Sequence, residues 1–213
     1  MKNNADVLNV PTLDLRSAFE KVLSYSIGDD KAKGCVEKLL CRYGSLATVL
    51  SEEVDEIARV GDVSINTALL IKMIGYINSR RVTERFELGC THDELEIREY
   101  LAAQFLGMSV ENVYAILLDG KGRVLSVEHV SNGTVNSSDV VPRKVLEFAK
   151  KKKATSVILA HNHPKGSAVA SSDDLVTTGR LAGVFASVGV RLLAHYIVAD
   201  GEISKIDASI YGV

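Results

Sequence analysis

The sequence predicts an α/β domain with a mixed sheet flanked by helices, preceded by a small all-helical domain. Two observations carry this prediction. Through residues 13–80, apolar residues recur at helical spacing and glycines separate the segments. After Gly107, short apolar and β-branched runs alternate with helical patterns, which is typical of chains that build a sheet with helices on its faces.

The composition is that of a soluble, cytoplasmic protein. Hydrophobic residues make up 46% of the chain, enough for a core, yet no apolar run is long enough to cross a bilayer. Residues 1–11 lack the basic-then-apolar layout of a signal peptide. Cys35, Cys41 and Cys90 show no CxxC spacing, which argues against a disulfide framework or a thiolate zinc cluster. We therefore expect reduced thiols and no membrane partner.

Residues 1–82 form the predicted helical domain. They carry 11 basic and 11 acidic residues, so the domain has no net charge to attract nucleic acid. Three of its helices are expected from apolar residues at helical spacing: Leu15, Phe19, Val22 and Leu23; Val36, Leu39, Leu40 and Tyr43; Leu69, Ile71, Ile74 and Ile77.

A break near residues 80–89 precedes the predicted second domain, residues 90–213. Thr91 and Glu94 have the spacing of a capping box, with Thr91 as N-cap of a helix that ends at Gly107. Two apolar runs around the turn sequence 119–122 predict a β-hairpin. The elements expected after Gly107 are strands over 113–118 and 123–130, a helix from about Pro142, a buried strand over 155–160, a helix over 175–188, and strands over 190–199 and 203–206.

One basic cluster, residues 150–153, follows the apolar pattern of the helix expected from Pro142. Lysines in a last helical turn interact favourably with the helix dipole, so a solvated helix end is the default interpretation. A phosphate-binding patch is the alternative.

The stretch from His161 to Asp174 carries the pattern with the most specific chemistry. His161 and His163 follow a predicted strand with one residue between them, so on an extended backbone both side chains point to the same side. Imidazoles suit Zn²⁺, and a carboxylate can supply a third protein ligand. We choose Asp174, in the first turn of the next helix, with Asp173 as the alternative. Three protein ligands leave the fourth tetrahedral position for water, as in a catalytic zinc site.

Asp174 also has an interpretation that needs no metal. Ser171 precedes it by three residues, which is the spacing of an N-cap and a carboxylate favoured by the helix dipole. The two interpretations are compatible, because a helix start beside a strand end can direct Asp174 at the histidines. Other chemistries are excluded: the sequence has no HExxH, no PCxxC and no GxxxxGK[ST] motif.

The pattern His161-x-His163, seven residues, Ser171, two residues and Asp174 matches the JAMM (MPN+) metalloprotease motif. The flanking stretches resemble the bacterial RadC family more closely: ENVYAILLD (111–119), NGTVNSS (132–138), Pro142-Arg143, ILAHNHPKG (158–166) and LLAHYIVADG (192–201). The resemblance implies a JAMM/MPN-type fold, a curved sheet with flanking helices that holds one zinc ion per chain. It also implies hydrolysis of peptide or isopeptide bonds, with a peptide or protein of unknown identity as substrate.

The resemblance selects two catalytic residues. Glu111 matches the family's glutamate ahead of the first strand, which as general base would take a proton from a zinc-activated water. From the residues alone, Glu128 competes for this role. Ser171 matches the serine expected to hydrogen-bond the developing oxyanion.

Two further histidines stay open. His195 fits a histidine near the end of the RadC pattern, although Ala194 stands where an aspartate is expected. A hydrogen-bonded strand histidine is the default interpretation for His195 and for His129, and support of a metal ligand is the alternative for His195.

The RadC resemblance also implies an N-terminal helix-hairpin-helix whose Gly-x-Gly loop meets DNA phosphates. In residues 60–68 of this sequence, Gly61 is the sole glycine, Asp62 adds negative charge, and Thr67 replaces the loop lysine. Phosphate binding through backbone N–H groups needs an unobstructed loop, so we describe this domain as degenerate and DNA as a disfavoured partner. The alternative function is a DNA-associated or scaffold protein whose zinc domain serves structure or binding.

Overall fold

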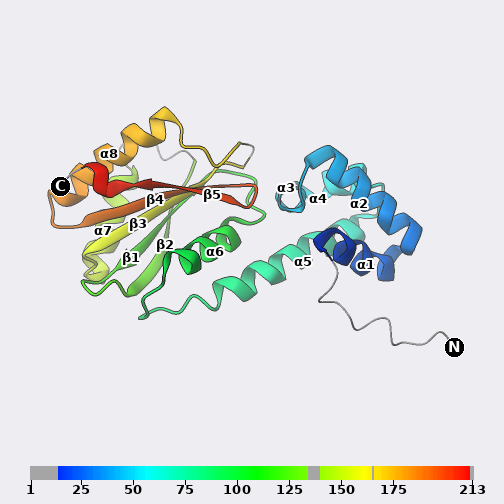
Figure 1. Cartoon of the computed structure of the whole chain (residues 1–213), viewed down its shortest axis with the longest axis horizontal. Helices are drawn as coiled ribbons and strands as arrows, with labels where there is room; N and C mark the ends of the chain where they lie inside the picture. The colour runs from blue at the N-terminus through cyan, green and yellow to red at the C-terminus, as the bar shows by residue number, and fades with distance from the viewer. Residues whose placement is uncertain (1–13, 134–139, 165, 212–213) are drawn as a thin grey trace. The chain divides into compact units, whose positions relative to one another are not determined.

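The computed structural model describes residues 14–133, 140–164 and 166–211. The sequence predictions on residues 1–11 and on most of the 132–138 stretch lie outside these ranges. The chain divides into two compact units, Met1–Ile74 and Gly75–Val213, and each is described by itself (Figure 1).

The first unit is all-helical, as predicted. Its helices are α1 (Leu15–Ile27), α2 (Asp29–Tyr43), α3 (Leu46–Ser51), α4 (Val54–Gly61) and the first part of α5 (Ile65–Thr83). Their amphipathic faces meet in one core, whose fully buried members include Leu23, Val36, Leu39, Val49, Ile57 and Ile71.

The residues that connect α4 and α5 pack and bond within the helical unit. A Cβ atom added to Gly61 would lie 2.9 Å from the Sγ atom of Cys35, so this glycine permits a close approach of α4 to α2. Asp62 ends α4 in the left-handed conformation (φ 54°, ψ 49°) and forms a 3.0 Å ion pair with Lys38. The Ser64 hydroxyl accepts a hydrogen bond from the backbone N–H of Thr67, which is buried.

The second unit contains a five-stranded mixed sheet, which confirms the predicted fold class. The strands are β1 (Asn112–Leu118), β2 (Val124–Asn132), β3 (Ser156–Asn162), β4 (Arg191–Ala199) and β5 (Glu202–Asp207), in the order β2-β1-β3-β4-β5. β3 and β4 are parallel, and the other neighbouring pairs are antiparallel, including the predicted hairpin of β1 and β2.

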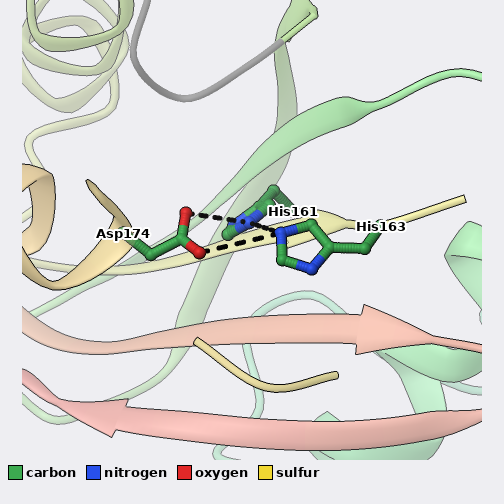
Figure 2. A group of neighbouring side chains, drawn as sticks. All are labelled: His161, His163 and Asp174. Carbon is green, nitrogen blue, oxygen red and sulfur yellow. Dashed lines mark hydrogen bonds and ion pairs between the residues drawn. The ribbon is translucent and has the colours of Figure 1, made fainter. Parts of the chain in front are cut away.

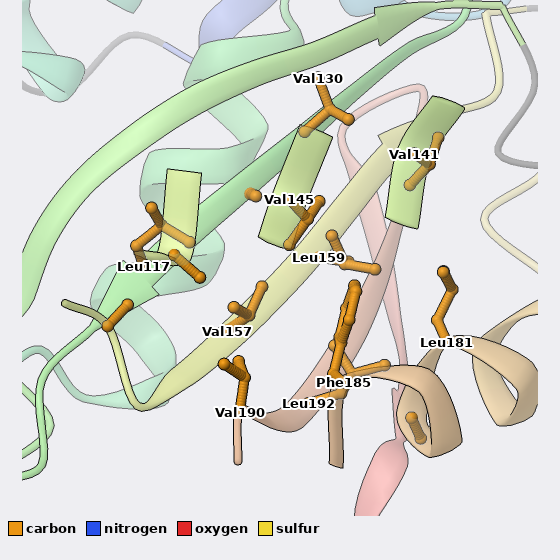
Figure 3. Packing of buried hydrophobic residues seen from close by; sticks show 14 of the residues in the cluster. Leu117, Val130, Val141, Val145, Val157, Leu159, Leu181, Phe185, Val190 and Leu192 are labelled. Atoms are coloured by element: carbon orange, nitrogen blue, oxygen red, sulfur yellow. The ribbon is translucent and has the colours of Figure 1, made fainter. Parts of the chain in front are cut away.

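Helices cover both faces of this sheet. Helices α7 (Val140–Lys152) and α8 (Ser172–Ala186) pack on one face, and α6 (Glu94–Phe105) packs on the other (Figure 1). Val157 and Leu159 of β3 point toward α7 and α8, where they meet Phe185 and other apolar side chains (Figure 3). Because side chains alternate along a strand, His161 points to the same face as Leu159.

The predicted starts of two helices need correction. The capping box of α6 is formed by Asp93 and Glu96, not by Thr91 and Glu94, because Asp93 presents its carboxylate to the N–H of Glu96 at 2.8 Å. Thr91 instead forms an isolated β-bridge with Arg123. Pro142 lies in the first turn of α7 but is not its first residue, since the helix includes Val140.

The strand before the histidine pair is also longer than predicted. β3 continues to Asn162, so His161 belongs to the strand itself and only His163 lies beyond it. Within the described residues, no single helix combines the length and apolar character needed to cross a membrane. Helices α4 and α5 meet those criteria only as a pair, and that pair is bent by 117°.

Candidate metal centre

The end of β3 and the start of α8 bring three candidate ligands together. His161 and His163 come from the strand end, and Asp174 comes from the first turn of the helix (Figure 2). One nitrogen or oxygen atom from each residue lies within 4.8 Å of the other two. The predicted set is therefore assembled in space, and Asp173, the alternative ligand, is not part of the cluster.

The distances in this cluster suit a small cation. The Nε2 atoms of His161 and His163 are 2.9 Å apart. The carboxylate of Asp174 places Oδ1 3.3 Å from Nε2 of His161 and Oδ2 3.7 Å from Nε2 of His163. Tetrahedral zinc with bonds of 2.0–2.1 Å to nitrogen separates its ligand atoms by about 3.3 Å. The nitrogen–nitrogen separation is shorter than that value, and the two carboxylate separations, each to a different oxygen, equal or exceed it.

The proton positions of His163 also suit a metal. Its Nδ1 atom lies 3.0 Å from the carbonyl oxygen of Ser167, which can only accept a hydrogen bond. Nδ1 therefore carries a ring proton, which leaves Nε2 as the ring nitrogen that could bind a metal. Together with the Asp174 carboxylate, this donor set fits zinc.

Asp174 is held in place by the helix cap. The backbone N–H and the hydroxyl of Ser171 donate to its Oδ2 atom at 2.8 and 2.6 Å. The backbone N–H of Asp174 donates in return to the Ser171 hydroxyl oxygen at 3.1 Å. The capping and ligand interpretations of Asp174 thus describe the same geometry: the cap orients the carboxylate and leaves Oδ1 facing His161.

Electrostatics keep Asp174 ionised. Burial alone would raise the pKa of its carboxyl group, but contact with His161 and hydrogen bonds from Ser171 outweigh burial and hold that pKa well below its ordinary value. Asp174 is 5% exposed and His161 is fully buried, while the side chain of His163 is 24% exposed. The open side of the cluster therefore lies toward His163.

A second buried histidine, His195, contacts the ring of His161 on the side away from the cluster. Nδ1 of His161 lies 2.8 Å from Nε2 of His195 on the neighbouring strand β4. Nδ1 of His195 lies 2.7 Å from the hydroxyl of Thr178 on α8. Complete burial, together with the nearby His161, lowers the pKa of His195 to about 3.

Glu111 lies one residue before β1, beside the same end of the sheet. Val113 pairs with His161 across β1 and β3. Glu111 and His163 each lie two residues beyond that pair. Both therefore lie just past the strand ends on the side of the sheet where the cluster is found. The carbonyl oxygen of Glu111 accepts a 2.8 Å hydrogen bond from the backbone N–H of Gly133.

Asn162, between the two histidines, forms hydrogen bonds with the backbone on both sides of Glu111. Its Oδ1 atom accepts a 2.7 Å hydrogen bond from the backbone N–H of Asn112. Its Nδ2 group donates to the carbonyl oxygen of Val110 at 3.1 Å. The backbone of the proposed base is therefore tied directly to the strand that supplies the histidine ligands.

Other candidates from the sequence lie elsewhere. Glu128 is on β2, 3.7 Å from Lys152 in an ion pair, and is not part of the ligand cluster. His129 bonds the side chain of Asn112 at 3.0 Å, which agrees with its default interpretation as a hydrogen-bonded strand histidine. Lys150, Lys151 and Lys152 occupy the exposed last turn of α7, as expected for a solvated helix end.

Sequence reasoning missed Asn162 and Thr178. Asn162 was visible only as the residue between two ligands, and its amide could have signalled a buried partner because β3 is apolar up to Ala160. Thr178 follows Asp174 by one helical turn, so it shares the helix face of a ligand.

Comparisons with known proteins point to one family. Residues 91–209 match the family model described as a RadC-like JAB domain. The chain is 37% identical over 193 residues to a UPF0758 protein of Finegoldia magna, covering 90% of this chain and 78% of the relative. It is 37% identical over 174 residues to a UPF0758 protein of Geobacter sulfurreducens, covering 78% and 74%. A UPF0758 protein of Ectopseudomonas mendocina is 34% identical over 166 residues, covering 78% and 74%.

Proposed function

Since the chain belongs to the RadC family, we propose that its RadC-like JAB domain is a zinc-dependent hydrolase that cleaves amide bonds in a peptide or protein. One observation carries the proposal: two imidazoles and one carboxylate converge at distances suited to tetrahedral zinc. Three protein ligands form an open set, which is typical of catalytic zinc sites, whereas structural sites use four.

The residues of the centre would divide the work. His161, His163 and Asp174 would hold one zinc ion per chain. Bound zinc supplies Lewis acidity that polarises a carbonyl group and lowers the pKa of water toward neutrality. Glu111 would accept the proton of the attacking water and return it to the leaving amine. The tie between Asn162 and the backbone around Glu111 would fix the distance between base and ligands.

Ser171 is our candidate for the residue that donates a hydrogen bond to the oxyanion. Its hydroxyl donates to Asp174 in this structure, so a role toward the substrate requires the hydroxyl to rotate away from the carboxylate. Ser171→Ala should reduce turnover by about 10²- to 10³-fold, the usual effect of removing one oxyanion donor, while zinc stays bound.

The test combines metal analysis with a peptide-library cleavage screen of the full chain. Wild-type protein should retain one zinc ion per chain after dialysis and should cleave a subset of peptides. Glu111→Gln should retain zinc but lose turnover, since its amide cannot accept the proton. Glu128→Gln is the matched control and should stay active. Cleavage that survives Glu111→Gln and is lost in Glu128→Gln would reverse the assignment of the base.

A further inference from the structure

Two buried residues, His195 and Thr178, extend a chain of hydrogen bonds from the ligand His161, and its donors and acceptors can be assigned. It runs from His161 on β3 through His195 on β4 to Thr178 on α8, and it ends at the backbone carbonyl of Asp174. All three side chains are fully buried. The chain therefore starts at one ligand and ends on the backbone of another.

The carbonyl oxygen fixes the first proton. The hydroxyl of Thr178 lies 2.6 Å from the Asp174 carbonyl oxygen and 2.7 Å from Nδ1 of His195. A carbonyl oxygen can only accept, and a hydroxyl has a single proton. The Thr178 proton is therefore donated to Asp174, and its oxygen accepts the proton on Nδ1 of His195.

The remaining protons follow in order. A neutral imidazole carries a single ring proton, and that of His195 is on Nδ1, where it meets the Thr178 oxygen. Nε2 of His195 therefore has a lone pair and accepts from Nδ1 of His161 across 2.8 Å. With its ring proton on Nδ1, His161 presents an unprotonated Nε2 that can accept across the 2.9 Å contact with His163.

We propose that His195 and Thr178 are positioning residues that select the metal-binding tautomer of His161. The inference rests on the proposed zinc site. The competing arrangement places the His161 proton on Nε2, where it would bond Nε2 of His163 at 2.9 Å and block the cluster. That arrangement requires the proton of Thr178 to leave the Asp174 carbonyl. Because Thr178 lies one turn after Asp174, the same helix supplies one ligand and, through His195, orients the ring of a second ligand, His161.

The experiment uses the full chain, metal-free and labelled with ¹⁵N at histidine. Two-bond ¹H–¹⁵N spectra report which ring nitrogen of His161 carries the proton. Zinc affinity is then measured by competition with a chromophoric chelator. The variants are His195→Leu, which removes the acceptor, His195→Gln, whose amide oxygen can replace it, and Thr178→Val, which removes the hydroxyl at equal size.

His195→Leu should weaken zinc binding by about 10- to 100-fold, the usual cost of losing a partner behind a ligand. His195→Gln should restore affinity to within about threefold of wild type, and Thr178→Val should fall between them. The control is His92→Leu, because His92 is also mostly buried but bonds Glu87 and Glu96, away from the cluster. His92→Leu should bind zinc as wild type does.

Three results would overturn the inference: an Nε2–H tautomer of His161 in the metal-free wild type, unchanged affinity in His195→Leu, or equal losses in His195→Leu and His195→Gln. The last result would assign His195 to packing alone. If wild-type protein binds no zinc, the proposed function fails, and the tautomer spectra still test the chain of hydrogen bonds. If His195→Leu does not fold, His195→Gln and Thr178→Val carry the comparison.

Discussion

Two connections that lead into helices make opposite use of their polar residues. Before α8, Ser171 caps the helix and turns Asp174 toward two histidines, so candidate ligand atoms from three residues lie close together. Before α5, Asp62 pairs with Lys38 and Ser64 bonds the backbone of Thr67. The first connection directs polar atoms at a shared point, and the second uses them within the helical unit.

The difference shows that the residue pattern implied by a family resemblance is present in one region of this chain and not in the other. The metal motif matches at every ligand position, and the structure brings those positions together. Residues 60–68 depart from the glycine and lysine pattern that the resemblance led us to expect, and their one glycine, Gly61, is explained by its close approach to Cys35. We therefore expect duplex DNA to bind the full chain no more tightly than the nonspecific range of about 10⁻⁴–10⁻⁶ M at physiological salt.

The largest expected effect separates two neighbouring carboxylates. Asp174→Asn should abolish stoichiometric zinc binding, since the amide removes the negative charge that faces both histidines. Asp173→Asn, one residue earlier in the same turn, should retain zinc because Asp173 lies outside the cluster. Metal analysis of both dialysed proteins makes the comparison.

The opposite pattern, zinc lost in Asp173→Asn and kept in Asp174→Asn, would exchange the roles of the two residues. Loss in both variants with unchanged helix content would indicate that the net charge of the helix start, and no single ligand, holds the metal.

The second prediction concerns the link between the ligands and Glu111. Asn162→Ala leaves the buried N–H of Asn112 without its partner, whereas the carbonyl oxygen of Val110 keeps a hydrogen bond from the side chain of Asn112. The free energy of unfolding should fall by about 1–3 kcal/mol, the usual cost of one unpaired buried group. Zinc should remain bound, because no ligand atom is removed.

Urea denaturation measures this loss, with Asn132→Ala as the control. Asn132 is exposed at the end of β2, so its removal should change stability by no more than about 0.5 kcal/mol. Equal stability of the two variants would mean that the Asn162 bonds contribute nothing net.

The sequence predicted the main elements because their signals are local. Alternating and helical apolar patterns located the strands of the sheet and all the long helices, and motif spacing selected His161, His163 and Asp174. The missed features depend on contacts between distant segments. Asn162 reaches residues 50 and 52 positions away. The sequence left two interpretations of His195 open, because its partner His161 is 34 positions away. The capping box of α6 was misplaced because Thr91 and Asp93 both precede a glutamate by three residues.

The third prediction tests whether Gly61 serves packing. Gly61→Ala brings a Cβ atom to 2.9 Å from Cys35, so it should destabilise the helical unit by about 1–3 kcal/mol, as overpacking usually does. Gly34→Ala is the control: it lies inside α2 with no atom near its Cβ position, so it should stabilise by about 0.5–1 kcal/mol. A neutral Gly61→Ala in thermal unfolding would contradict the packing role.

The smallest expected effect is a pH-dependent difference among thiols. Burial raises the pKa of Cys35 to about 11, whereas Cys41 and Cys90 are exposed. At pH 8, iodoacetamide should modify Cys41 and Cys90 and spare Cys35, as peptide mass mapping would report. The raised pKa stabilises the fold below about pH 9, and this contribution is lost as the pH rises through about 11. Rapid modification of Cys35 at pH 8 would show that the helical core opens readily.

The central claim is the zinc site, and anomalous X-ray diffraction at the zinc absorption edge tests it most directly. Crystals of the full chain grown with zinc should show one anomalous peak per chain. That peak should lie about 2.0–2.2 Å from Nε2 of His161, Nε2 of His163 and a carboxylate oxygen of Asp174, with a non-protein fourth ligand. A peak elsewhere, no peak at this cluster, or a fourth protein ligand that closes the site would contradict the account.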